Sequence, residues 1–496
     1  MDDTPRSLPR NLHFVGVGGS GMSALAQLHA LAGHRVTGSD RAFDAGERGE
    51  IRSHLERTGV TILPQDGSGP RPGTEAAVLS TAVEEGIPDV RAARERGVAL
   101  WHRSELLSAH VRRHRTVAVT GTSGKSTVTA MIFAILRGAG ADPGLLTGGP
   151  LVDLQAEGYL GNAWAGAGAG AGGWLVVEAD ESDGTLVRYR PWAGVILNLG
   201  RDHKEPAEVA AMFATFRDQV EGPLIVGEDP ALDFLRVSAR GAAATTFGLG
   251  AGCDLRADQV RLSGDGSRFS VEGVEFVLHR TGRHDVLNAL AALAAGRACG
   301  VDLDTMVQPL ARFGGVTRRF QSLGTAAGVE VVDDFAHNAD KIAAALAAAR
   351  ARLGHAAAAS AAPTGATAAR PDGAGGRVLV AYQPHGFGPT RFLRDDLIAA
   401  FAAHLRGGDV LWLPEIYYAG GSVTRDISSR DLAEGIRARG RDARFLPDRD
   451  DLPATVAAEA RPGDLVLIMG ARDPSLTGLG RAVLAAVAAA GDPGPV

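Results

Sequence analysis

A short turn near residue 122 carries the residue types that bind nucleotide phosphates. Residues 120–127 read T-G-T-S-G-K-S-T and stand between an expected strand and an expected helix. Glycines allow backbone amides to surround a phosphate, Lys125 can reach the terminal phosphates, and the Ser126 hydroxyl is a ligand for Mg²⁺. Only two residues separate Gly121 from Gly124, where the standard P-loop has four. The turn therefore predicts a shortened ATP loop.

Acidic side chains follow two apolar runs farther along the chain. Directly after the run that begins at Trp174 come the carboxylates of Glu178, Asp180, Glu181 and Asp183. Asp202 and His203 follow the next apolar run in the same way. In open α/β sheets the carboxyl ends of the strands face the ligand crevice, and carboxylates near a phosphate loop suit Mg²⁺. The pattern predicts a metal or substrate role rather than a solvated acidic loop.

Another glycine-rich turn, the first glycine turn of the chain, occurs near the N-terminus. Residues 16–21 read G-V-G-G-S-G and fit the G-x-G-x-x-G pattern between an expected strand and an expected helix. There, small residues let the backbone approach a diphosphate, and the helix N-terminus supplies amide donors and partial positive charge. Asp40 ends the next expected strand, where a ribose-binding acid often stands. The turn predicts a nucleotide diphosphate, in a dinucleotide or in another ligand.

The elements that position both turns alternate between apolar strands and helical patterns, which is typical of parallel α/β architecture. A length of 496 residues is too great for one core, and the alternation divides into units over 1–109, 110–312 and 313–496. Two turns on separate units predict two phosphorylated ligands. The segments 165–173 and 355–376 lack large apolar side chains, and we expect loop insertions there.

The overall composition argues against several classes of protein. A net charge of −6, spread along the chain, disfavours nucleic acid or an anionic membrane as the main partner. No apolar run is long enough for a membrane span, and the N-terminus lacks a signal-peptide pattern, so we expect a cytoplasmic protein. Cys253 and Cys299 match no metal spacing, and we expect two buried thiols.

Taken together, the motifs resemble the Mur ligase family along nearly the whole chain. The turn G-V-G-G-S-G-M, the following G-S-D and the stretch from L-S-T-A-V to W-H-R-S-E-L-L are similar to its UDP-binding domain. T-G-T-S-G-K-S-T is similar to its short ATP loop, and E-A-D-E-S-D-G and the later D-H pair to its metal-binding strand ends. G-R-H-D-V-L-N-A, G-V-T-R-R-F-Q and D-D-F-A-H-N look like its adenine-side helix start and the opening of its C-terminal domain. Each motif alone is weak or moderate evidence for the family, whereas the occurrence of all of them in the same order is specific evidence.

The resemblance implies a fold and a reaction. It implies a Rossmann-like UDP-sugar-binding domain over 1–109, a central P-loop ATPase-type parallel-sheet domain that binds ATP over 110–312, and a Rossmann-like C-terminal domain for the incoming amino acid over 313–496. The expected enzyme is an ADP-forming acid–amino-acid ligase. It would join an amino acid, L-alanine first of all, to the carboxylate of UDP-N-acetylmuramate through an acyl phosphate, in peptidoglycan synthesis. ATP and Mg²⁺ would be its cofactors, and the chain would act as a monomer or homodimer.

The resemblance also implies roles for individual residues. ATP would be bound by Gly121, Thr122, Ser123, Gly124, Lys125, Ser126, Thr127, His284, Asn288, Arg319 and Asp334. Mg²⁺ would be bound by Ser126, Glu178 and His203. The chemistry would depend on Lys125, Glu178, His203, Arg318 and His337. The UDP-sugar would be bound by Gly18, Gly19, Ser20, Gly21, Met22, Asp40, Ser80 and Thr81. The incoming amino acid would meet His385.

Several positions depart from the family's pattern. Ser123 stands where the family usually has His or Asn, and Asp285 where it has Asn. Alanine-adding members carry a second His at the position of Asn338 and an Arg at that of Gly386, and a histidine expected near the uridine diphosphate is absent from 63–68. The missing arginine would pair with a carboxylate, a contact worth roughly 1.5–3 kcal/mol. Because the changes lie in substrate pockets, we expect preserved activation chemistry with an altered amine or sugar.

Other interpretations stay open. F-A-H at 335–337 resembles the peptide-recycling relative, which adds a tripeptide, and R-F-Q at 319–321 resembles the alanine-adding enzyme. A ligase for a tripeptide or for another amino acid is therefore one alternative. A NAD(P)-binding oxidoreductase would explain the first glycine turn but not the ATP loop. A non-catalytic UDP-sugar sensor would explain the altered pockets but not the presence of Lys125, Glu178 and His203.

Overall fold

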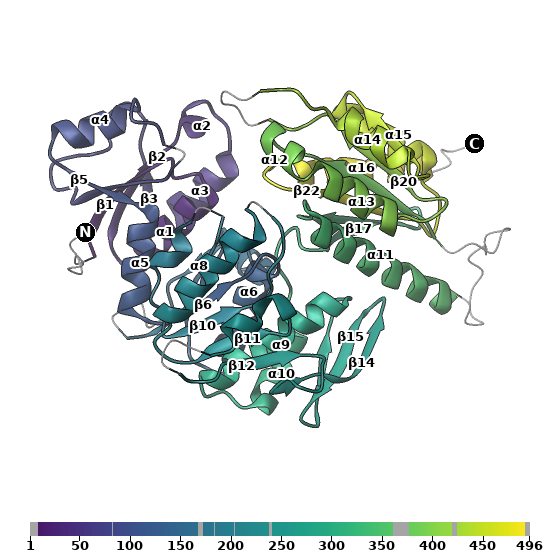
Figure 1. Cartoon of the computed structure of the whole chain (residues 1–496). Helices are drawn as coiled ribbons and strands as arrows, with labels where there is room; N and C mark the ends of the chain where they lie inside the picture. Colours follow the sequence, from purple (N-terminus) through teal and green to yellow (C-terminus); the bar gives the residue numbers. More distant parts are fainter. Residues whose placement is uncertain are drawn as a thin grey trace.

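The chain folds into three α/β parts, and the prediction of a three-domain α/β protein with parallel sheets is confirmed (Figure 1). The computed structural model describes the residues 8–81, 83–166, 172–182, 184–202, 204–237, 241–360, 376–418 and 424–491, with backbone only from 355 to 360. No helix among these residues is both long enough and apolar enough to cross a membrane.

The N-terminal part is a five-stranded parallel sheet in the order β3-β2-β1-β4-β5. Its strands are β1 (Asn11–Val15), β2 (Arg35–Ser39), β3 (Val60–Ile62), β4 (Ala76–Leu79) and β5 (Ala99–His102). Its helices are α1 (Ser20–Leu31), α2 (Arg41–Asp44), α3 (Gly49–Arg57), α4 (Pro88–Glu95) and α5 (Arg103–Arg113). Helices cover both faces of such a sheet, and Phe14 and Val15 of the central strand β1 are fully buried.

The central part is built on an eight-stranded sheet in the order β13-β12-β11-β10-β6-β9-β7-β8, in which only the β7–β8 pair is antiparallel. The strands are β6 (Arg115–Thr120), β7 (Gly144–Leu146), β8 (Ala163–Trp164), β9 (Trp174–Glu178), β10 (Ala193–Ile196), β11 (Leu224–Gly227), β12 (Thr245–Gly248) and β13 (Leu255–Arg256). The helices are α6 (Lys125–Gly138), α7 (Val152–Ala156), α8 (Pro206–Gln219), α9 (Arg283–Ala298) and α10 (Leu303–Ala311), with short 3-10 turns η1 (Thr185–Arg188) and η2 (Pro230–Leu235). Strand β6 lies between β9 and β10, so the ATP loop and the acidic strand end meet at one edge.

A small antiparallel sheet in the central part was not foreseen in the sequence. It consists of β14 (Asp258–Ser263), β15 (Gly266–Val271) and β16 (Val274–Leu278). Hairpin turns at 264–265 and 272–273 join short strands that are only partly buried, and β14 has no buried residue. Such a local pattern is weaker than the long apolar runs of the parallel sheets, because one face of an antiparallel sheet can remain in water.

The C-terminal part has a six-stranded sheet in the order β17-β18-β22-β19-β20-β21, in which β17 alone is antiparallel to its neighbour. The strands are β17 (Gln321–Ala326), β18 (Val329–Asp334), β19 (Val378–Gln383), β20 (Val410–Pro414), β21 (Ala443–Leu446) and β22 (Leu465–Gly470). The helices are α11 (Ala339–Ser360), α12 (Phe387–Phe392), α13 (Arg394–His404), α14 (Ser429–Arg437), α15 (Leu452–Glu459) and α16 (Leu476–Gly491), with the turn η3 (Arg449–Asp451).

Helix α11 corrects one expectation and connects two parts of the molecule. The segment 355–376 was expected to be irregular from its start, but α11 continues through 360, because alanine favours helix even without large apolar contacts. The remainder of that segment, and 167–171 of the other expected insertion, lie outside the described residues. Arg352 of α11 donates to the carbonyl oxygen of Gly264 in the central part and pairs with Glu330 of β18. Figure 1 shows α11 in green beside the β14–β15 hairpin.

Candidate active site

The ATP loop is held in place by the side chain of Asn198, which follows β10. Its Oδ1 accepts hydrogen bonds from the Thr122 hydroxyl and the Ser123 amide, both at 2.9 Å, and its Nδ2 donates to the Ser123 carbonyl at 3.0 Å. Gly121 has a φ of +145°, and a Cβ there would lie 2.8 Å from the Cβ of Leu197. The loop therefore needs glycine at this point, and it leads directly into α6, whose N-terminal amides favour a phosphate.

Lys125 lies in the first turn of α6 among acidic groups. Its Nζ donates to Glu181 Oε2 at 2.7 Å and to the Gly121 carbonyl at 2.8 Å, and it lies 3.5 Å from Asp180 Oδ1. Burial lowers the pKa of Lys125, but these carboxylates outweigh that effect and raise it above its ordinary value. Burial raises the pKa of Glu181 to about 7, against the lowering effect of Lys125. The ammonium is thus charged and fixed beside the phosphate loop.

Glu178 and Ser126 both lie beside a different loop, residues 147–149. Glu178 Oε2 accepts hydrogen bonds from the Thr147 hydroxyl at 3.0 Å and the Gly148 amide at 2.7 Å. A Cβ on Gly149 would lie 3.3 Å from the Cβ of Ser126. Carboxylate and hydroxyl oxygens in this place suit Mg²⁺. His203, the third expected ligand, lies outside the described residues, as does Asp183, and no group of three or more His, Cys, Asp or Glu in the described part has a metal-binding arrangement.

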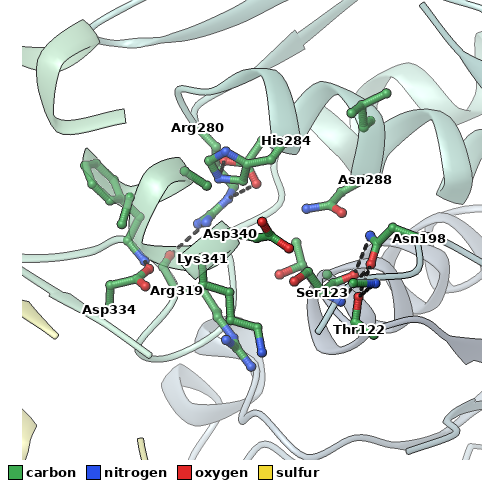
Figure 2. Close-up of a pocket in the computed structure, with 18 of the residues that line it drawn as sticks. Thr122, Ser123, Asn198, Arg280, His284, Asn288, Arg319, Asp334, Asp340 and Lys341 are labelled. Carbon is green, nitrogen blue, oxygen red and sulfur yellow. Dashed lines mark hydrogen bonds and ion pairs between the residues drawn. The ribbon is translucent and has the colours of Figure 1, made fainter. Parts of the chain in front are cut away.

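A cavity of about 350 Å³ opens beside the ATP loop, between the central and C-terminal parts (Figure 2). The expected nucleotide-binding residues on its wall are Thr122, Ser123, Gly124, Thr127, His284, Asn288, Arg319 and Asp334. Asn288 and Gly124 lie close together, since a Cβ on Gly124 would be 2.5 Å from Asn288 Oδ1. Asp285, which departs from the family pattern, lies 3.3 Å from the guanidinium of Arg280, so its charge is compensated within the pocket.

The two neighbouring arginines at 318 and 319 have different surroundings. Arg318 pairs with Asp333 at 3.2 Å and donates to the Gly470 and Asp473 carbonyls, at 2.7 and 3.1 Å, so it is engaged inside the C-terminal part. Arg319 lines the cavity, and its guanidinium lies over the Phe335 ring at 4.8 Å. Burial lowers the pKa of Arg319, which indicates a cation in a setting that an anionic ligand would stabilise.

Asp334 organises the backbone on the C-terminal side of the cavity. It accepts hydrogen bonds from the amides of Phe320 and Ala336, both at 2.7 Å. Burial raises the pKa of the Asp334 carboxyl, while Arg319 acts in the opposite direction. Asp334 therefore holds the segment that carries Arg319.

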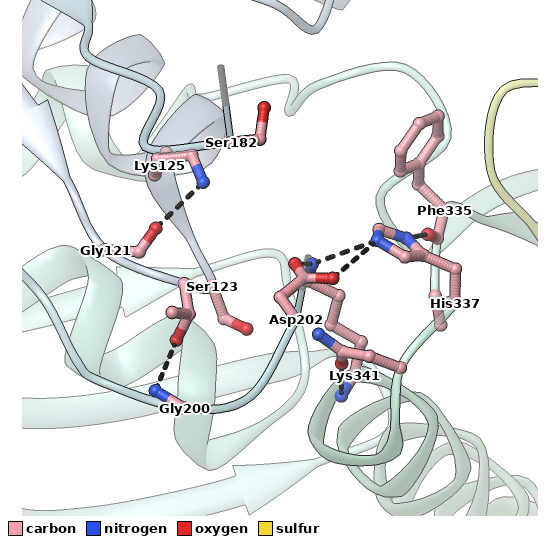
Figure 3. Close-up of polar contacts among 12 residues, drawn as sticks. Gly121, Ser123, Lys125, Ser182, Gly200, Asp202, Phe335, His337 and Lys341 are labelled. Atoms are coloured by element: carbon pink, nitrogen blue, oxygen red, sulfur yellow. Dashed lines mark hydrogen bonds and ion pairs between the residues drawn. The ribbon is translucent and has the colours of Figure 1, made fainter. Parts of the chain in front are cut away.

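Asp202, His337 and Lys341 meet where the central and C-terminal parts touch (Figure 3). Lys341 Nζ donates to Asp202 Oδ2 at 2.6 Å, and His337 Nε2 lies 3.3 Å from Asp202 Oδ1. The Nδ1 of His337 donates to the Phe335 carbonyl at 2.8 Å. Burial lowers the pKa of His337 to about 4, assisted by Lys341 and opposed by Asp202. Lys341 was missed in the sequence, as were Asn198 and Arg280.

The first glycine turn folds around Asp40. Asp40 accepts from the Gly18 amide at 2.9 Å and caps α2 through the Ala42 amide at 3.0 Å. A Cβ on Gly21 would lie 2.8 Å from Arg103 Nη1, which places a guanidinium beside the turn. The structure also brings to this turn the expected residues Gly19 and Ser20, and the end of β4 carries Ser80 and Thr81. Met22 is buried in the core of the N-terminal part.

Two departures from the family pattern, Asn338 and Gly386, have structural reasons. Both lie in the region expected to bind the incoming amino acid. Asn338 Oδ1 accepts from the Lys341 amide at 3.0 Å and so caps the start of α11, a place that asparagine favours. Gly386 has a φ of +68° and a ψ of 131°, a conformation nearly restricted to glycine. His385 lies nearby, with its ring 5.6 Å from that of His337.

Family models match three consecutive segments of the chain. They are "Mur ligase family, catalytic domain" over 11–115, "Mur ligase middle domain" over 119–296 and "Mur ligase, glutamate ligase domain" over 318–472. UDP-N-acetylmuramate–L-alanine ligase of Xanthomonas axonopodis pv. citri is 36% identical, with 95% of this chain and 94% of that protein covered. The corresponding protein of Phenylobacterium zucineum is 34% identical, with 93% and 92% covered.

Solved structures share the fold. The UDP-N-acetylmuramate-alanine ligase of Thermotoga maritima matches with a TM-score of 0.74 at 24% identity, covering 96% of this chain and 98% of that one. A murein peptide ligase of Psychrobacter arcticus matches with a TM-score of 0.65 at 24% identity, covering 97% and 99%. The three-part architecture is therefore the one found in these ligases.

Proposed function

The chain belongs to the Mur ligase family, and on that premise we propose that it is an ADP-forming ligase that joins L-alanine to the carboxylate of UDP-N-acetylmuramate in peptidoglycan synthesis. Relatives with this named activity align with nearly all of the chain. The observation that carries the proposal is one cavity, bordered by the ATP loop on one side and by Arg319 on the other.

In this proposal each of the three parts binds one substrate. Residues 1–109 would bind the UDP-sugar at the first glycine turn, 110–312 would bind ATP, and 313–496 would bring the amino acid. The proposed reaction has two steps. A carboxylate oxygen of the sugar acid attacks the γ-phosphorus of ATP and releases ADP, which leaves an acyl phosphate. The amine then attacks the acyl carbon, inorganic phosphate leaves, and the amine loses a proton.

The residues of the cavity suit a reaction that brings several anions together, since cations must offset the repulsion. Lys125 would bind the β- and γ-phosphates from the first turn of α6. Mg²⁺, held by Ser126, Glu178 and His203, would neutralise phosphate charge. Of the two neighbouring arginines, Arg319 is the better candidate for the transferred phosphoryl group, because Arg318 is engaged elsewhere.

A ligase for a different amine is a second candidate, and one observation favours it. Gly386 stands where alanine-adding enzymes carry an arginine, in a backbone conformation that an arginine rarely adopts. The carboxylate of the incoming amino acid would then need another partner. The activation of the sugar acid would be unchanged, because Gly386 is not on the wall of the nucleotide cavity.

Phosphate release with ATP, Mg²⁺ and UDP-N-acetylmuramate tests both candidates. The amine panel contains L-alanine, glycine, L-serine and the cell-wall tripeptide. Release with L-alanine and a product of matching mass supports the first candidate, and release with another amine alone supports the second. Lys125→Ala should abolish release in either case. Binding of the UDP-sugar without release for any amine would favour the sensor alternative.

A further inference from the structure

The use of lysine in this chain is unusually selective. Of the 51 basic residues, only Lys125, Lys204 and Lys341 are lysines, and the rest are arginines. Lys125 belongs to the ATP loop, and Lys341 lines the nucleotide cavity from the C-terminal side. Arginine and lysine are not equivalent, because lysine offers a compact point charge that fits beside a single phosphoryl group. Lys341 therefore needs an explanation beyond general surface charge.

Lys341 is placed by the first turn of α11. Asn338 caps this helix by accepting from the Lys341 backbone amide. The ammonium lies 2.6 Å from Asp202 Oδ2 and 3.4 Å from His337 Nε2, and the side chain is only 15% exposed. Figure 3 shows it extending from the helix toward the loop that carries Asp202. A C-terminal cation thus reaches the edge of the central sheet where the acidic strand ends lie.

Lys341 has one acidic partner, Asp202, and two cationic neighbours, Lys125 and Arg319. Burial lowers its pKa, and Lys125 and Arg319 lower it further, whereas Asp202 raises it. Lys125 is at the start of α6, next to the ATP loop, and Arg319 lines the cavity from the C-terminal part. Three partly buried cations so close together favour an anion of high charge, such as the terminal phosphates of a nucleoside triphosphate, in addition to the carboxylates that Lys125 and Lys341 already contact.

We propose that Lys341 binds the γ-phosphoryl group of ATP from the C-terminal wall of the cavity, and that Asp202 holds its ammonium in position for this contact. The inference rests on the proposed function, since it names a further ligand for the group that is transferred. When the phosphoryl group moves to the sugar acid, the same ammonium stays beside it. Lys341 would thereby make the docking of the C-terminal part depend on the third phosphate.

Nucleotide affinity separates this role from a purely structural one. We would measure dissociation constants for ADP and for the β,γ-imido analogue of ATP, both with Mg²⁺, in the full chain and in Lys341→Met. Loss of a charge-assisted contact should weaken binding of the analogue about tenfold or more and change ADP binding less than about twofold. Lys204→Met is the matched control, because Lys204, just before α8, pairs with Glu208 in the first turn of that helix.

The outcomes discriminate clearly. Equal weakening for ADP and the analogue would mean that Lys341 only joins the two parts, and unchanged affinity for both would likewise overturn the inference. A wild-type chain that binds neither nucleotide would overturn the proposed function as well. Should Lys341→Met not fold, Lys341→Gln keeps a polar end toward Asp202 and allows the same comparison.

Discussion

Substitution of Asn198 tests whether its side chain holds the ATP loop in its phosphate-binding conformation. The Asn198 side chain makes three hydrogen bonds to Thr122 and Ser123, with lengths between 2.9 and 3.0 Å. Asn198→Ala removes all three and leaves the Ser123 amide and carbonyl to find other partners. The loop would then sample conformations in which its amides no longer surround a phosphate.

The magnitude follows from the number of bonds. At about 1 kcal/mol for each hydrogen bond, the ordered loop loses about 3 kcal/mol relative to its alternatives. If ATP binds only the ordered loop, its affinity should fall about a hundredfold. The affinity for UDP-N-acetylmuramate should stay within about twofold, because Asn198 makes no contact with the first glycine turn.

Asn162→Ala is the matched control. Asn162 is a buried asparagine whose side chain likewise makes three hydrogen bonds, but these go to Gln27, to the Ser20 carbonyl and to the Ser23 hydroxyl beside the first turn. Titration calorimetry with ADP and with the UDP-sugar should show opposite patterns for the two variants. If Asn198→Ala folds and keeps its nucleotide affinity, or if both variants lose both ligands equally, the reasoning is refuted.

Two further predictions concern stability. Burial, assisted by His34, lowers the pKa of His29 to about 3 from an unfolded value near 6.5, so the unfolded chain gains a proton first as the pH falls. The stability contribution of neutral His29 is complete above pH 6.5 and is lost toward pH 3, by about 2 kcal/mol at pH 5. Urea unfolding at pH 7 and pH 5 should show this loss, and His29→Gln should reduce it; an equal loss in the variant would contradict the assignment. Gly386→Arg should lower the free energy of unfolding by about 1–3 kcal/mol, because φ at this position is +68°. Gly388→Arg on α12, where a Cβ would meet nothing within 4 Å, should change the free energy of unfolding little. Equal shifts of the melting temperature in the two variants would contradict the explanation from the positive φ of Gly386.

The sequence determined much of the fold and the location of the ATP loop. Glycine, lysine and hydroxyl residues between a strand and a helix specify such a loop locally, because backbone conformation there depends on near neighbours. Long apolar runs likewise predicted the parallel strands. The carboxylates at the end of β9 were expected near the phosphate loop, and Glu181 there pairs with Lys125. The short antiparallel sheet at 258–278 escaped prediction because its half-exposed strands carry a weaker apolar pattern.

Only the tertiary structure decided which side chains face the cavity from the C-terminal part. Arg318 and Arg319 are adjacent and chemically identical, yet Asp333 and two carbonyls engage the first while the second lines the cavity. Lys341 and Asp202 are 139 residues apart and meet through the docking of α11 against the central part. The physical reason is that hydrogen bonding along a segment sets its local shape, whereas packing between segments distant in the chain sets the direction of each side chain.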